Sequence, residues 1–111
     1  MPISFQADAA SKQAYLKQCQ FEQNLGGGVS VIASSSFTAT MAIDNCGFTN
    51  NGGTALSASG TGALIRVSDC TINSNTTGIS ANNGGQILSR RNNTLEDNPT
   101  GNTFPGTYRP K

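Results

Sequence analysis

Carboxylates are the residues of this chain best suited to acid–base chemistry, because the chain contains no histidine. A glycosidase uses two carboxyl groups about 5 to 9 Å apart across a cleft. Asp44 and Asp69 come closest to this requirement, since both lie in the turn before a cysteine. Alignment on those cysteines, however, places Asp44 beside Ser68 and Asn45 beside Asp69, and Asp is an ordinary turn residue. We therefore predict that the protein is not an enzyme.

Basic and aromatic residues form a second candidate, a binding surface. They lie shortly before a repeated Cys or Asn position, and the candidate binding residues are Tyr15, Arg66, Arg90 and Arg91. Together they predict a groove for an anionic polysaccharide or for the acidic surface of a protein partner. The alternative is a solvated face on which Lys17 pairs with Asp44.

The cysteines and glycines favour structural roles. Zinc sites need four ligands, whereas this chain has three cysteines, no histidine and no closely spaced Cys pair. The glycines Gly26, Gly27 and Gly28 precede Val29, which begins an expected strand, so the helix N-terminus of a phosphate loop is missing. We predict buried cysteines, turn glycines, and neither a metal nor a cofactor.

Composition limits the remaining function classes. The 111 residues predict one domain, spanning 1–111. A net charge of +1 with scattered basic residues argues against nucleic acid as a partner. The apolar runs are far shorter than the roughly 20 residues that cross a bilayer, so no membrane partner is expected. The start of the chain lacks the pattern of a secretory signal, which favours a cytoplasmic location.

Internal repeats organise the whole chain. One motif, Cys or Asn followed by any residue, an apolar residue, any two residues and Asn, occurs as CQFEQN, CGFTNN, CTINSN and NTLEDN. The closing asparagines are separated by 27, 24 and 23 residues. Two further registers keep step with this motif, namely ISF, VSV, LSA, ISA and the degraded NTF, and also AYL, MAI, IRV and ILS. Each period therefore contains three short stretches with apolar residues at every second position.

This periodicity predicts an all-β fold, a parallel β-helix of about four coils with three short strands per coil. Coils stacked about 4.8 Å apart place equivalent residues above one another. We expect the cysteines to form an inward column continued by Asn93, and the closing asparagines to form a hydrogen-bonded ladder at one corner. The apolar positions of the motif form a second column, of Phe21, Phe48, Ile72 and Leu95.

The four motifs, the strands GVSV and GISA and the segment GGQILSRRNNTLEDN resemble the right-handed parallel β-helix proteins of the pectin-lyase-like superfamily. The resemblance covers almost the whole chain and is closest to a short C-terminal portion of such proteins. It implies the right-handed fold. It does not imply one function, because the superfamily includes polysaccharide lyases, glycosidases and adhesins.

The two ends of the stack are expected to differ. Residues 1–18 are predicted to form a first partial coil or cap, with a short amphipathic helix in DAASKQAYLKQ as the alternative to a strand. Residues 99–111 are predicted to form a C-terminal cap, where Phe104 and Tyr108 fold over the last coil. Ile3 and Phe5 would then lie at an open N-terminal edge, which makes them candidates for self-association.

From these observations we expect a non-catalytic binding or assembly module. Its partners would be a carbohydrate or a protein, contacted through an outward face or through the open N-terminal end. A remnant carbohydrate-active enzyme is the alternative. An ice-binding solenoid is a third possibility, disfavoured because the threonines are scattered over different columns.

Overall fold

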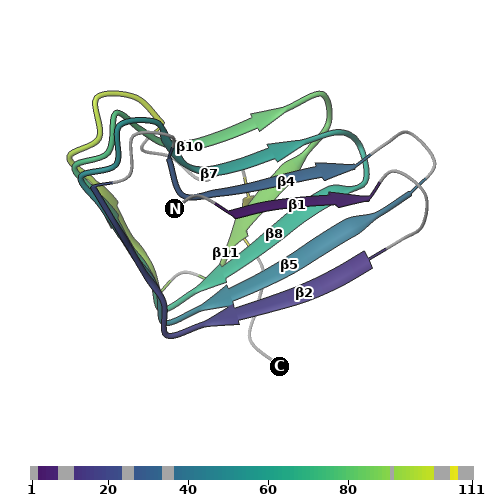
Figure 1. Ribbon diagram of the computed structural model, residues 1–111, viewed down its shortest axis with the longest axis horizontal. Coiled ribbons are helices and arrows are strands. Elements are labelled where there is room, and N and C mark those ends of the chain that lie inside the picture. Colours follow the sequence, from purple (N-terminus) through teal and green to yellow (C-terminus); the bar gives the residue numbers. More distant parts are fainter. Residues whose placement is uncertain are drawn as a thin grey trace.

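Short parallel strands with outward and inward side chains in alternation build three sheets, as the computed structural model shows (Figure 1). The structure describes residues 3–7, 12–23, 27–33, 37–90, 92–101 and 106–107, and these contain strands, turns and no helix. Sheet A consists of β1 (Ile3–Ala7), β4 (Val29–Ala33), β7 (Thr54–Ser59) and β10 (Thr77–Asn82). Sheet B consists of β2 (Lys12–Lys17), β5 (Ala39–Asp44), β8 (Ala63–Ser68), β11 (Gln86–Ser89) and β13 (Gly106–Thr107). Sheet C consists of β3 (Gln20–Glu22), β6 (Gly47–Thr49), β9 (Thr71–Asn73) and β12 (Thr94–Glu96).

The chain visits the three sheets in turn, so consecutive strands belong to different sheets and neighbours within a sheet come from successive coils. Figure 1 looks nearly along the stack and shows the sheets as the sides of a triangle, with sheet A across the top and sheet B below it. This is the predicted β-solenoid with three strands per coil. Sheets of four, five and four strands lie close to the predicted coil number.

The predicted registers are confirmed for the described strands, whereas the degraded NTF, at residues 102–104, lies outside the described residues. In sheet A, Ile3 pairs with Val29, and Val29 pairs with Leu56. In sheet B, the inward column runs from Ala14 through Met41 and Ile65 to Ile87. Alternation explains the result, because strand β5 has every second residue buried. Lys12–Lys17 is strand β2, so the alternative of a helix in this segment is wrong.

The core fills the space between the sheets. Phe21 and Phe48 stack at a centroid distance of 4.8 Å with an interplanar angle of 5°. This distance equals the usual spacing of neighbouring strands, so the two rings follow the stacking of the coils. Ile72 lies next in the column and is fully buried, whereas Leu95 is partly buried against the core.

A ladder of asparagines closes the corner after sheet C. Asn51 and Asn75 are buried, and each donates its side-chain amide to a backbone carbonyl of the preceding coil, at Phe21 and Phe48. The side-chain oxygen of each ladder asparagine also accepts a hydrogen bond from the preceding member. Asn75 Oδ1 accepts the backbone N–H of Asn51, and Asn98 Oδ1 accepts the backbone N–H of Asn75. The ladder is therefore polar, with a fixed direction along the stack. Asn24, its expected first member, lies outside the described residues.

The cysteine column at the other corner follows the same logic. Cys46 Sγ accepts the backbone N–H of Cys19 at 3.4 Å, and Cys70 Sγ accepts that of Cys46 at 3.4 Å. Asn93 ends the series, since its Oδ1 accepts the N–H of Cys70 at 2.8 Å. All three cysteines are free thiols; Cys46 and Cys70 are buried in the core, as predicted, whereas Cys19 in the first coil is only partly buried.

Both corners need a left-handed backbone. The residue before each cysteine, and the residue before each ladder asparagine, has φ between 54° and 61°, at Gln18, Asn45, Asp69, Gln23, Asn50, Ser74 and Asp97. In the turn before β4, Gly27 has φ of 97°, and a Cβ there would collide with the carbonyl oxygen of Thr54. Glycine is required at this turn, which confirms its structural role.

The C-terminal segment continues the stack in part. Thr100 bridges to Thr77, and β13 pairs with β11. Phe104 and Tyr108 lie outside the described residues. The expected boundaries of the caps, 1–18 and 99–111, therefore stay predictions.

Candidate binding site on sheet B

The outer face of sheet B carries an open hollow of about 440 Å³. Three aligned residues create it: Tyr15 on β2 pairs with Ala42 on β5, which pairs with Arg66 on β8. Because the side chain of Ala42 is only a methyl group, the large side chains of Tyr15 and Arg66 border a depression above it. The hollow is lined by Gln13, Ala14, Tyr15, Thr40, Ala42 and Arg66.

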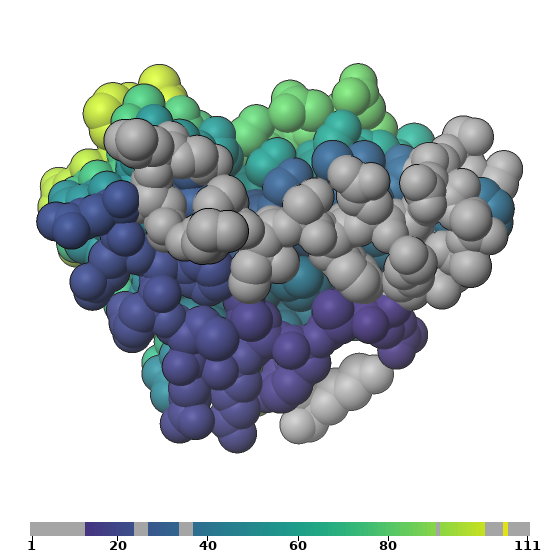
Figure 2. Space-filling model, in the orientation of Figure 1, coloured from purple at the N-terminus to yellow at the C-terminus, as the bar shows by residue number. Residues whose placement is uncertain are grey.

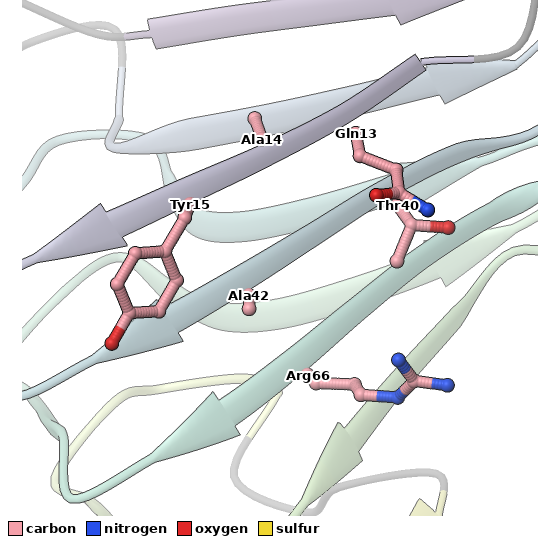
Figure 3. Close-up of a pocket in the computed structure, with 6 residues that line it drawn as sticks. All are labelled: Gln13, Ala14, Tyr15, Thr40, Ala42 and Arg66. Atoms are coloured by element: carbon pink, nitrogen blue, oxygen red, sulfur yellow. The ribbon is translucent and has the colours of Figure 1, made fainter.

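The side chains around this hollow differ in chemistry from one side to the other. Figure 3 shows the Tyr15 ring at one side, and the polar groups of Gln13, Thr40 and Arg66 toward the other. Two coil spacings separate the backbones of Tyr15 and Arg66, which is roughly 10 Å. An aromatic face thus lies across from a guanidinium, with an amide and a hydroxyl beside it.

Tyr15 is held in place by the neighbouring coil. Its hydroxyl donates to Asp44 Oδ2 at 3.2 Å, although the side chain is 61% exposed. Desolvation of the hydroxyl and its bond to the Asp44 carboxylate raise the pKa of Tyr15. The residue is therefore a neutral aromatic surface around physiological pH, with its ring oriented by Asp44.

The other predicted binding residues fall at different distances from the hollow. Arg90 follows β11, is half-buried, and donates its backbone N–H to Val67, but its side chain is not part of the lining. Arg91 lies outside the described residues. Lys17 is exposed and lies beside Asp44 in the register, and an ion pair between their side chains stays a prediction. The structure thus unites Tyr15 and Arg66 in one hollow and leaves Arg90 apart.

Comparison with known proteins adds the family. A family model described as a right-handed beta helix region matches residues 11–106. The chain belongs to the right-handed β-helix family. No curated protein and no solved structure shows significant similarity to it. The resemblance to the pectin-lyase-like superfamily is consistent with this match, and the family by itself leaves the function of this β-helix open.

The acidic pair considered from the sequence is arranged in the β-helix as the alignment indicated. Asp44 pairs with Ser68 in the ladder, and Asp69 lies one residue farther along, in the left-handed corner. Neither carboxylate lines the hollow. In the described parts of the chain, no group of three or more His, Cys, Asp or Glu side chains could hold a metal ion.

Two thiols of the β-helix are buried in its core. Burial raises the pKa of the Cys46 thiol, and burial raises the pKa of Cys70 to about 11, so both stay protonated and unreactive near neutral pH.

Across the part of the chain that the structure describes, no helix has the length and hydrophobicity of a membrane span.

Sequence reasoning missed Gln13, Thr40 and Ala42 as parts of the hollow. The signal for Ala42 was present, since the middle letters of AYL, MAI and IRV are Tyr15, Ala42 and Arg66. A small residue between two large ones in a stacked column predicts a depression. Gln13 and Thr40 carry no comparable signal, because polar outward residues occur at many positions of this β-helix.

Proposed function

We propose that this β-helix is a non-catalytic binding module that holds a carbohydrate on the outer face of sheet B. The observation that carries the proposal is the position of Tyr15 and Arg66 on either side of Ala42. Exposed aromatic rings supply rigid apolar surface with a polar tip, which suits the apolar face of a sugar ring. A guanidinium binds carboxylate or sulfate groups in a bidentate manner, so an anionic polysaccharide fits best.

Rigid placement supports this function. The hollow lies on three strands that pair along six residues each, and Tyr15 is fixed further by Asp44. A site on strands loses little conformational entropy when a ligand binds. Its open shape suits a chain that lies across the sheet rather than a small molecule that needs enclosure.

The lining of the hollow favours binding over hydrolysis. Glycoside hydrolysis needs two carboxyl groups about the scissile bond. Among the described residues the lining includes an amide, a hydroxyl, a phenol and a guanidinium, and no carboxylate. The nearby Asp44 carboxylate already accepts the Tyr15 hydroxyl.

The test measures binding of polygalacturonate and of uncharged dextran by calorimetry or affinity electrophoresis. We expect polygalacturonate to bind, and Arg66→Ala to weaken it by roughly tenfold or more, the usual value of a hydrogen bond to a charged group. Tyr15→Ala should weaken it as well. Arg66→Lys keeps the charge but loses the planar fork, so an intermediate affinity is expected.

Glu22→Ala on the outer face of sheet C is the matched control and should bind like the wild type. Equal binding by Arg66→Ala and the wild type would refute the site. Release of unsaturated or reducing sugar ends in the presence of calcium, abolished in Asp69→Ala, would instead establish the remnant enzyme.

A further inference from the structure

In the described part of the chain, no strand pairs with the outer edge of the N-terminal coil. Strands β1, β2 and β3 are each the last strand of their sheet, all at this end. Figure 2 views the molecule from that end and shows purple atoms of β2 at its surface. In the described residues, β5 is the single ladder partner of β2.

Burial falls off at the same edge. Met41 and Ile43 on β5 are 3% and 1% exposed, and Cys46 is 3% exposed. Their counterparts one coil earlier, Ala14, Leu16 and Cys19, are only partly buried. The inward side chains of the first coil are therefore incompletely covered.

Two hydrogen bonds to the neighbouring coil fix which backbone groups of β2 point toward the outer edge. Gln18 donates its N–H to Asp44 on the β5 side, and the Leu16 carbonyl accepts from Cys46 Sγ on that same side. The N–H and C=O of one residue in a strand point to one side, and the next residue points to the other. The backbone groups of Gln13, Tyr15 and Lys17 therefore face the free edge.

We propose that a second copy of this chain pairs with this edge, β2 against the partner's β2, antiparallel about a two-fold axis at Tyr15. Tyr15 then lies opposite the partner's Tyr15, and Gln13 lies opposite the partner's Lys17. All of these residues point their backbone groups at the edge, so three opposed pairs supply about six hydrogen bonds. An isologous contact of this kind closes on itself and gives a dimer.

This register also suits the side chains. Lys17 faces an uncharged Gln13 of the partner, so no like charges lie directly opposite each other. Inward, Ala14 lies opposite the partner's Leu16, which completes the burial of both. Outward, the two tyrosines form an aromatic cross-strand pair, and each ring also borders the hollow on its own copy.

The C-terminal end of a second copy fits this N-terminal edge less well than its N-terminal end does. At the C-terminal end, β11 already pairs with β13, and Thr77 is bridged by Thr100. In the described residues, the two-residue strand β13 and the Thr100 bridge thus occupy part of the C-terminal edge of sheets A and B, which disfavours head-to-tail stacking. The extents of 35 × 33 Å enclose a triangle of roughly 600 Å² per copy, so the dimer buries at most about 1,200 Å² and forms reversibly.

Sedimentation equilibrium of the intact chain over a range of concentrations is the first test. The wild type should show a concentration-dependent dimer. Gln13→Pro removes an N–H that faces the free edge and leaves the ladder to β5 intact, as proline does on edge strands. We expect it to raise the dimer dissociation constant roughly thirtyfold, because each dimer loses two hydrogen bonds. Gln13→Ala keeps the N–H and should dimerise like the wild type.

Cross-linking tests the register itself. In Tyr15→Cys the two engineered thiols face each other at a Cα separation of about 5.5 Å, which a disulfide spans. Glutathione disulfide takes up the two electrons and two protons, and is reduced to two glutathione thiols. With the partly exposed Cys19 replaced by serine in both variants, we expect a reducible covalent dimer from Tyr15→Cys and none from Arg66→Cys, which lies on the same face two coils away.

Three outcomes overturn the proposal: a wild type that stays monomeric at the highest soluble concentration, a Gln13→Pro variant with native circular dichroism that dimerises as well as Gln13→Ala, or equal cross-linking of the two cysteine variants. If Gln13→Pro does not fold, the cross-linking comparison decides alone. Loss of sugar binding without loss of the dimer, or the reverse, separates this proposal from the proposed function.

Discussion

Asn75 Oδ1 accepts two hydrogen bonds from Asn51, one from its backbone N–H at 3.0 Å and one from its side-chain amide at 2.8 Å. Both residues are almost completely buried. A buried backbone N–H needs a partner, and here the partner is the side chain of the next coil. The corner is therefore a cooperative unit that spans coils, and it fixes their vertical alignment.

Replacing Asn75 by alanine should be among the most damaging single changes. Asn75→Ala leaves the N–H of Asn51 and the carbonyl of Phe48 without their partners in the interior. We expect a loss of about 3–5 kcal/mol in the free energy of unfolding, measured by urea titration. Asn73→Ala, which removes a side-chain contact with Thr49 near the surface, should cost about 1 kcal/mol or less. Similar losses in the two variants would contradict the ladder's role.

A corner serine should be improved by glycine. Ser74 is exposed and has φ of 59°, a conformation that costs a residue with a Cβ about 1–2 kcal/mol. Ser74→Gly should therefore raise the free energy of unfolding by about 0.5–1 kcal/mol after the entropy loss of glycine is included. Ser57→Gly, the same change inside strand β7, should lower it by about that amount. Thermal unfolding of the pair tests the opposite signs.

Alkaline pH should weaken the fold through Cys70. Burial raises its pKa from about 9 to about 11, so the fold prefers the neutral thiol. The corresponding stability is fully present below pH 9 and is lost as the pH rises from about 9 to about 11, up to about 3 kcal/mol. Urea unfolding under reducing conditions at neutral pH and at pH near 10.5 measures this loss. Cys70→Ala should show a smaller alkaline decrease, although it is less stable at neutral pH.

Thiol labelling should separate the cysteines by coil. Cys19 is partly exposed in the first coil, whereas Cys46 and Cys70 are buried. We expect a disulfide reagent to label Cys19 of the native, dilute protein quickly, and the other two only after unfolding in guanidinium chloride. Cys19→Ser should abolish the fast phase. Fast labelling that persists in this variant would show that the core column opens more readily than its burial indicates.

Repeated positions could be predicted from the sequence, and unrepeated ones could not. Stacked coils place equivalent side chains against one another, so the same residue types recur at similar spacing. Examples are the cysteines, the ladder asparagines, and Phe21 stacked on Phe48. The left-handed corners were visible in part, since Asn45, Asn50, Asp69 and Asp97 are residue types that favour positive φ. Gln18 and Gln23 carry no such signal, although they adopt the same conformation.

The candidate binding site was predictable only in part. Tyr15 and Arg66 stand out as chemical types, and the structure brings them together. Their shared hollow depends on the small size of Ala42 and on the polar residues Gln13 and Thr40. These polar residues could not be picked out from the sequence, because outward positions vary from coil to coil. Inward residues repeat in the sequence because they pack against the coils above and below. Outward residues are free of this constraint, so a ligand site on an outer face produces no repeat in the sequence.

The one-way order of the corner hydrogen bonds bears on how such a gene changes length. In the middle of the stack, the corner N–H groups of Cys46 and Asn51 donate to side chains of the following coil, which lie 24 residues farther along the sequence. A tandem copy of residues 46–69 would bring both halves of this exchange with it. Duplication can thus insert a whole coil without any compensating substitution in its neighbours, and each insertion adds fresh outer surface on which selection can act.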